Sequence, residues 1–289
     1  MSQAFDPFAG RGPRWFAIPS YRPFLEDLAA GILEWLGDAP PETLSDAVIL
    51  LPNRRAARAF GAALARQAGD RPVLLPQVRP LGDLEEDEPP FSPGDLGLDL
   101  PPAITPLSRR FEMARMIGQD FSGLFDREMT LPYALELADA LGGFIDSCQI
   151  EEIEDLGRVA NLVQGDLALH WEKSARFLSA SVEAWPKRLA ELGLIDPAAR
   201  RAKLLRLLAE RWDAHPPSGP VIAAGSTGSA PAAAAVLGAV ARAPMGCVVL
   251  PGLDHALSDD VWTSIGAGTD PEEQHPQSVL WRLLQSNNV

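Results

Sequence analysis

The chain has 289 residues, 46% of them hydrophobic, and a formal net charge of −14 at pH 7. This length suits about two domains, and the apolar content is that of a globular chain rather than a disordered one. No run approaches the roughly 18 apolar residues of a membrane-spanning helix, and residues 1–12 lack the pattern of a signal peptide. A freestanding nucleic-acid binder usually carries a basic surplus, so we expect nucleic acid to be held only by a local basic patch or with a partner.

The two cysteines, Cys148 and Cys247, are far apart in the sequence and both have apolar neighbours. This usage predicts small core residues in a reducing cytoplasm, without a disulfide. No group of cysteines and histidines has zinc-site spacing, and we predict neither a metal nor a cofactor.

Short strands alternate with amphipathic helices along residues 14–81. We predict strands at 14–19, 47–51 and 73–75, and helices at 24–36 and 53–67. Three strand–loop–helix units in succession favour a parallel sheet with right-handed crossovers.

An acidic, proline-rich stretch, Gly82–Pro102, then reads as a linker or surface loop. From Thr105 to His215 the pattern predicts helices only. In the first of these, Leu107 and Phe111 fall on the expected core face, and Asp196-Pro197 is typical of a helix start.

Residues 220–254 return to the strand pattern. Val221–Ala224 and Cys247–Leu250 are predicted buried strands on either side of an alanine-rich helix. Ser229 is expected to cap that helix, and Pro231 suits its first turn.

The predicted fold is therefore an α/β parallel sheet interrupted by an all-helical insertion. We expect the first part of the α/β domain at residues 1–104, the helical insertion at 105–215 and the return to the sheet at 216–289. The chain stops just after an amphipathic helix, and we expect it to be a fragment of a longer protein.

Two loops invite comparison with phosphate-binding motifs. Ser20–Phe24, after the first strand, has no glycine or lysine, so a structural turn is favoured there. Gly225–Ser229 is glycine-rich but matches neither G-x-G-x-x-G nor the G-x-S-x-G nucleophile elbow. Its alternatives are a tight turn or an anion contact at the following helix.

The one concentrated basic spot, Asn53 to Arg58, follows the second strand. Open parallel sheets bind ligands at the carboxyl ends of their strands, so a phosphate contact is one alternative and a solvated helix start is the other. The acidic run Asp83–Glu88 reads as solvated surface. Four scattered histidines form no triad, and we predict no catalytic residues.

Four stretches together resemble a known family: Val48–Arg58, Leu75–Asp83, Pro220–Ser229 and Val248–Asp254. They look like the amino-terminal region of the AddB family, the non-motor subunit of the bacterial AddAB helicase–nuclease for double-strand break repair by homologous recombination. The resemblance spans about Trp15 to Leu284. The family's nuclease and iron–sulfur cysteines have no counterpart in these residues.

The resemblance implies a RecA-like fold of the superfamily 1 helicase type whose motor has decayed. Ser20–Phe24 lies where the phosphate loop belongs, Asn53–Arg58 matches a loop that touches DNA, and Ala224–Ser226 replaces the metal-holding Asp-Glu pair. Without these groups phosphoryl transfer loses its main charge stabilisers.

The implied function is a non-catalytic scaffold that assembles with an AddA-type helicase–nuclease subunit and guides single-stranded DNA from the double-stranded substrate. The expected DNA contacts are Asn53, Arg54, Arg55, Arg58, Arg79, Thr227 and Ser229. Two alternatives stay open: a nucleotide-binding or hydrolysing enzyme that uses Gly225–Ser229, and a purely structural interaction module.

Overall fold

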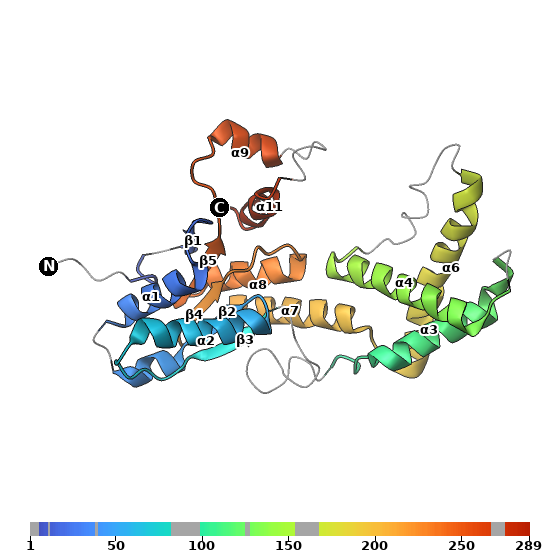
Figure 1. Ribbon diagram of the computed structural model, residues 1–289, viewed down its shortest axis with the longest axis horizontal. Coiled ribbons are helices and arrows are strands. Elements are labelled where there is room, and N and C mark those ends of the chain that lie inside the picture. Colours follow the sequence, from blue (N-terminus) through green and yellow to red (C-terminus); the bar gives the residue numbers. More distant parts are fainter. Residues whose placement is uncertain are drawn as a thin grey trace. The chain divides into compact units, whose positions relative to one another are not determined.

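The computed structural model describes residues 6–10, 12–37, 40–81, 99–124, 128–153, 168–266 and 275–289, with the side chains of 41 and 168–175 left out. The chain divides into two compact units (Figure 1). Unit 1 combines Met1–Pro93 with Leu205–Val289, and unit 2 is Gly94–Leu204. The expected insertion, 105–215, thus lies about ten residues further along the chain than unit 2.

Unit 1 is built on a five-stranded, all-parallel sheet in the order β1-β5-β4-β2-β3. Its strands are β1 (Trp15–Ile18), β2 (Val48–Leu51), β3 (Gln77–Pro80), β4 (Val221–Ala224) and β5 (Gly246–Pro251). The strands β4 and β5 lie inside the sheet and come from beyond unit 2 in the sequence. The predicted α/β parallel sheet is confirmed, and the strand at Ile222 pairs directly with the one at Ile49.

The predicted third strand is wrong. Val73–Leu75 is not a strand, and Leu74 and Leu75 are 53% and 62% exposed. The strand is Gln77–Pro80, whose register runs from Gln77 opposite Val48 to Pro80 opposite Leu51. It is an edge strand, where proline is tolerated because no second neighbour needs its missing N–H.

Helices cover both faces of the sheet. After β1 and β2 the chain moves towards β3 through α1 (Phe24–Leu36) and α2 (Arg54–Ala68), whereas β4 leads back to β5 through α8 (Pro231–Arg242). Right-handed crossovers in opposite directions require opposite faces. Unit 1 is completed by η1 (Pro41–Asp46), the second part of α7 (Pro197–Ala214), α9 (Asp259–Gly266) and α11 (Ser278–Ser286).

The pleat of the inner strands separates two apolar layers. Ile49 and Ile222 pack with the buried faces of α1 and α2, around Phe60. Leu50 and Ala223 alternate with them, are also fully buried, and therefore face the α8 side. Burial on both faces explains why the inner strands read as continuous apolar runs.

Unit 2 consists of helices around a separate apolar core. They are α3 (Pro106–Asp120), η3 (Ser122–Leu124), α4 (Leu131–Ile150), α6 (Ala168–Leu192) and the start of α7. Met113 and Ile117 of α3 pack there with Trp185 of α6. The expected core face of α3 is wrong at its start, because Leu107 and Phe111 are 63% and 51% exposed.

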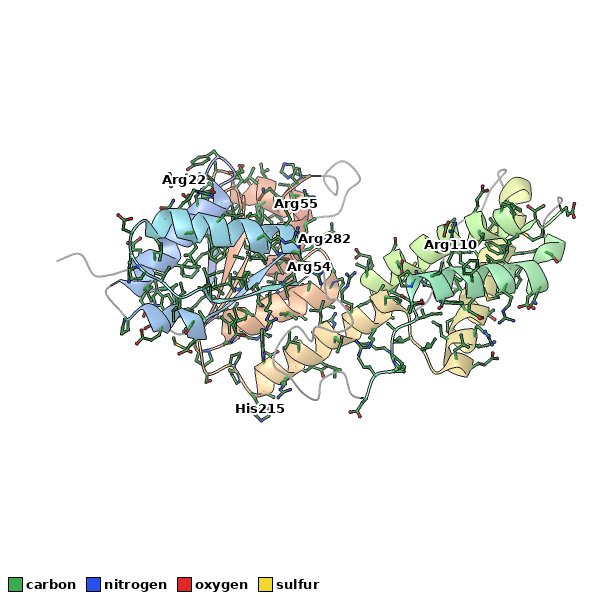
Figure 2. All side chains as sticks on the ribbon, turned by 60° about the horizontal axis from the view of Figure 1, so that its bottom comes forward. Arg22, Arg54, Arg55, Arg110, His215 and Arg282 are labelled. Atoms are coloured by element: carbon green, nitrogen blue, oxygen red, sulfur yellow. The ribbon has the colours of Figure 1, made fainter. Side chains whose placement is uncertain are left out.

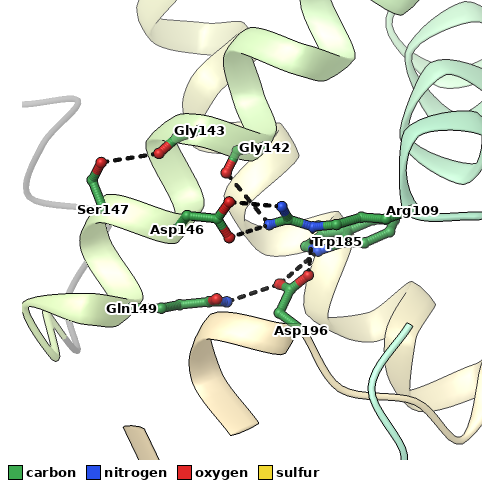
Figure 3. A network of polar contacts seen from close by, with 8 residues as sticks. All are labelled: Arg109, Gly142, Gly143, Asp146, Ser147, Gln149, Trp185 and Asp196. Carbon is green, nitrogen blue, oxygen red and sulfur yellow. Dashed lines mark hydrogen bonds and ion pairs between the residues drawn. The ribbon is translucent and has the colours of Figure 1, made fainter. Parts of the chain in front are cut away.

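A buried polar network ties these helices together (Figure 3). The Asp196 side chain, 1% exposed, accepts hydrogen bonds from Arg109 Nε at 2.8 Å, Gln149 Nε2 at 2.8 Å and Trp185 Nε1 at 2.9 Å. Arg109 also donates to both carboxylate oxygens of Asp146, at 2.8 and 2.9 Å. Side chains from α3, α4 and α6 therefore meet at one carboxylate, which lies just before α7.

Candidate nucleic-acid interface

The loops that follow β1, β2, β4 and β5 pack together at the carboxyl edge of the sheet. Gly225 has φ +77°, and a Cβ there would lie 3.1 Å from Cε1 of Phe24 and 3.5 Å from Cδ of Pro52. Gly252 has φ +66°, and its Cβ would lie 3.3 Å from Cβ of Ser20. Glycine thus allows both the left-handed backbone and the close approach.

The topology marks a particular place on this edge. β2 and β4 are neighbours, but the loop after β2 enters α2 on one face while the loop after β4 enters α8 on the other. A crevice opens at such a switch point, and ligands of open parallel sheets bind there. The two loops that the sequence singled out, at Asn53 and at Gly225, border this switch point.

The loop after β1 does not form a phosphate cradle. Pro23 precedes α1 and offers no N–H, and the ring of Phe24 lies against Gly225. The Arg22 guanidinium donates to both oxygens of Asp27, at 2.5 and 2.8 Å. These hydrogen bonds raise the pKa of Arg22 and hold its charge against α1.

The basic spot lies at the start of α2. Asn53 is the N-cap residue, and its Oδ1 accepts a hydrogen bond from Ala56 N at 2.9 Å, so this acceptor is used within the helix. Arg54 is half-buried, whereas Arg55 and Arg58 are exposed. Their spacing of three places Arg55 and Arg58 side by side on one helix face. The first turn of α2 contains no acidic residue.

The loop after β4 is compact. Ser226 Oγ accepts a hydrogen bond from Gly228 N at 3.3 Å, Thr227 is half-buried and Ser229 is exposed. Ser229 does not cap α8 as predicted: the N-cap is Ala230, without a side-chain hydrogen bond. Pro231 occupies the first turn of the helix, as predicted.

Arg79 lies apart from the other predicted contacts. It is half-buried on the edge strand β3, opposite Leu50 in the register. Because Val78 packs with the α1 and α2 core, the pleat directs Arg79 to the other face of the sheet. It does not join Arg55 and Arg58.

The helix α11 also packs against the carboxyl edge of the sheet, a contact that the sequence did not predict. Gln277, just before α11, donates from Nε2 to the Gly252 carbonyl at 2.9 Å and accepts at Oε1 from Asp254 N at 3.1 Å. A Cβ on Gly228 would lie 2.7 Å from Cδ1 of Leu283. Figure 2 shows Arg282 of α11 at the same end of the unit as Arg54 and Arg55. No sequence signal links Arg282 with α2, since the link exists only through this packing.

The described part of the chain contains neither a cluster of metal-ligating side chains nor a helix that could span a membrane. Within these ranges, no group of three or more His, Cys, Asp or Glu side chains is arranged to hold a metal ion. The acidic run Asp83–Glu88 lies outside those ranges. None of the described helices combines the length and apolarity needed to span a membrane.

Comparison with known proteins adds no family. A scan against protein-family models found no match, and a search of the curated proteins found none. The resemblance to the AddB family therefore stays a prediction from the residues, and the geometry of the sheet edge carries the functional argument.

Proposed function

We propose that this chain is a non-catalytic, RecA-like scaffold of the superfamily 1 helicase type, related to the AddB family, that guides single-stranded DNA and assembles with an AddA-type motor subunit. The observation that carries this proposal is the pair of exposed arginines, Arg55 and Arg58, at the carboxyl edge of a parallel sheet. They lie beside the switch point at which such sheets bind ligands.

The loops after β1 and β4 lack the groups that a helicase motor needs. ATP hydrolysis needs a backbone cradle with a lysine for the phosphates and a carboxylate for Mg²⁺. The first loop contains prolines, packs Phe24 against Gly225 and commits Arg22 to Asp27. Ala224-Gly225-Ser226 has no carboxylate at the end of β4.

The DNA contact is argued from charge. Arg55 and Arg58 repel one another, and Arg55 also opposes the positive end of the α2 dipole, with no acidic residue in the first turn to offset it. A phosphate backbone would relieve both effects and release its counterions. The net charge of −14 opposes long-range attraction, so the chain alone should bind weakly, near 10⁻⁴ M at physiological salt. A partner that completes the channel should tighten binding.

The test is a titration of a fluorescein-labelled oligo(dT) with the chain over about 50 to 200 mM salt. Replacing Arg55 and Arg58 by Ala should weaken binding and reduce the slope of log K against log salt by about 0.7 per lost contact. The matched control is Arg71→Ala with Arg211→Ala, because Arg71 follows the end of α2 and Arg211 lies near the end of α7, and these helix ends lead into the starts of β3 and β4. Equal slopes for the wild-type chain and the Arg55/Arg58 variant would refute these two arginines as DNA contacts and, with them, the proposed guiding role at this edge.

The enzyme alternative has its own test. Purified chain with Mg²⁺ and ATP, with and without DNA, should show background turnover only. An ATPase rate that disappears on Ser226→Ala or Thr227→Ala would replace the scaffold proposal by a nucleotide-hydrolysing function of the β4 loop.

A further inference from the structure

The last helix of unit 1, α11, contacts the rest of the unit at its start, its middle and its end. At the start of α11, Gln277 binds the loop after β5. In the middle of the helix, Leu283 packs on Gly228 of the β4 loop, and at its end the Asn287 side chain lies against Gly238 of α8. Two of these contacts are with loops of the carboxyl edge and the third is with α8, so packing within unit 1 determines the position of α11.

This packing links Arg282 to the α2 arginines across the β4 loop. Arg282 neighbours Leu283, which contacts the β4 loop at Gly228, and three residues earlier Gly225 packs on Pro52, just before α2. Three residues of backbone span at most about 11 Å. The part of the β4 loop that lies between the two basic groups, from Gly225 to Gly228, is therefore short. In the view of Figure 2, Arg54, Arg55 and Arg282 fall in the same region of unit 1, away from His215.

Pairing also distinguishes these arginines from others on the surface. Arg22 and Arg242 are exposed too, but each donates two hydrogen bonds to a carboxylate, Asp27 and Asp213 respectively. Arg55 and Arg282 have no carboxylate partner among the described residues. Their guanidinium groups keep the planar set of donors that fits a phosphate.

We propose that Arg282 contacts the phosphate backbone of the same DNA single strand as Arg55 and Arg58, so that α11 forms the second side of a track whose floor is the loop Gly225–Ser229. This inference rests on the proposed function. It adds a contact that is remote in sequence, and it places the strand across the switch point rather than along α2 alone. Exposed Ser229 and half-buried Thr227 then lie under the strand, between the two basic groups.

The experiment uses the same oligo(dT) titration with the variants Arg282→Ala, Arg282→Lys and, as the matched control, Arg211→Ala. Arg211 is also exposed, also has no ion pair among the described residues, and lies near the end of α7 that precedes the start of β4. Arg282→Ala should lower affinity severalfold at about 50 mM salt and reduce the slope by about 0.7, the value of one contact. Arg282→Lys should retain most of the slope, and Arg211→Ala all of it.

The outcomes separate the two proposals. If the wild-type chain binds and the Arg55/Arg58 variant loses slope while Arg282→Ala keeps it, the track is refuted and the proposed function stands. The track is also refuted if Arg282→Ala and Arg211→Ala behave alike, because the effect is then general charge. If the wild-type chain shows no salt-dependent binding even with an AddA-type partner, the proposed function itself fails. Unchanged thermal unfolding of each variant, followed by circular dichroism, confirms that the fold is intact.

Discussion

The buried carboxylate of Asp196 is the point at which unit 2 should be most sensitive to a single substitution. We consider Asp196→Ala and the near-isosteric Asp196→Asn. Both remove the charge that faces Arg109, and Ala also removes the acceptor that Trp185 Nε1 and Gln149 Nε2 share. Asn keeps one of the two acceptor oxygens but replaces the other by an NH₂ group, which cannot accept the hydrogen bonds that are donated at this site.

The magnitude follows from what each substitution leaves behind. Removing one partner of a buried ion pair costs about 3–5 kcal/mol. Arg109 keeps Asp146, which lowers this cost, whereas the indole N–H of the fully buried Trp185 loses its acceptor, at about 1–3 kcal/mol. We expect a destabilisation of about 4 kcal/mol for Asp196→Ala. With a urea m-value of about 2 kcal/mol per M, the midpoint of unit 2 falls by about 2 M.

Urea unfolding followed by circular dichroism measures this shift, and hydrogen exchange read by mass spectrometry assigns it to peptides of α3 and α4. The matched control is Asp139→Asn, which removes a carboxylate paired at 2.7 Å with Arg110, where both side chains are about half exposed. Exposed pairs contribute about 0–1 kcal/mol. If Asp196→Asn and Asp139→Asn shift the midpoint equally, the network does not hold unit 2 together.

Three further predictions concern other sites. Burial raises the pKa of the Cys247 thiol to about 12, so it should not react with a disulfide reagent at pH 8 until the chain unfolds, and rapid reaction of the native chain would contradict this. Gly228→Ala places a Cβ against α11 at φ +61° and should cost about 1–3 kcal/mol more than Gly69→Ala, which has φ +57° and open space; equal urea midpoints would show that α11 is not seated there. The hydrogen bond from Arg115 is the main cause that holds the pKa of Glu112 below its usual 4.5. The ionised Glu112 side chain therefore contributes to the stability of the fold above pH 4.5, and this contribution is lost as the pH falls through the lowered pKa of the folded state. Glu112→Gln should destabilise the chain at pH 7 and have no effect well below pH 4.5. Urea midpoints measured at the two pH values would show this difference.

The strands inside the sheet were predictable because burial on both faces produces a continuous apolar run in the sequence. Val221–Ala224 is apolar at every position, and all four residues are buried. The edge strand was misplaced because the apolar triplet Val73–Leu75 looks more like a strand than Gln77–Pro80. Pairing with β2 decides the outcome, and the sequence of an edge strand alone does not encode that pairing.

The candidate site was predictable only in part, for a similar reason. Residues that follow a strand directly, such as Arg55, can be placed at the carboxyl edge from the sequence. The pleat that turns Arg79 away and the packing that links Arg282 to the β4 loop depend on tertiary contacts. Asp196 shows the same limit: it precedes α7 as predicted, but its carboxylate is used by three other side chains.

The strand order also dictates when the sheet can form during synthesis. β1 and β2 do not pair with each other, because β5 and β4 lie between them and are made only after all of unit 2. β2 can pair early with β3, but at a typical translation rate β1 waits on the order of ten seconds for β5, and the other edge of β2 waits as long for β4. Unit 2 is contiguous in the sequence and can fold in that interval. The nascent chain thus holds a helical unit behind an incomplete apolar sheet, in which β1 is unpaired and one edge of β2 is open. A chaperone would bind at this stage, and aggregation would begin at it.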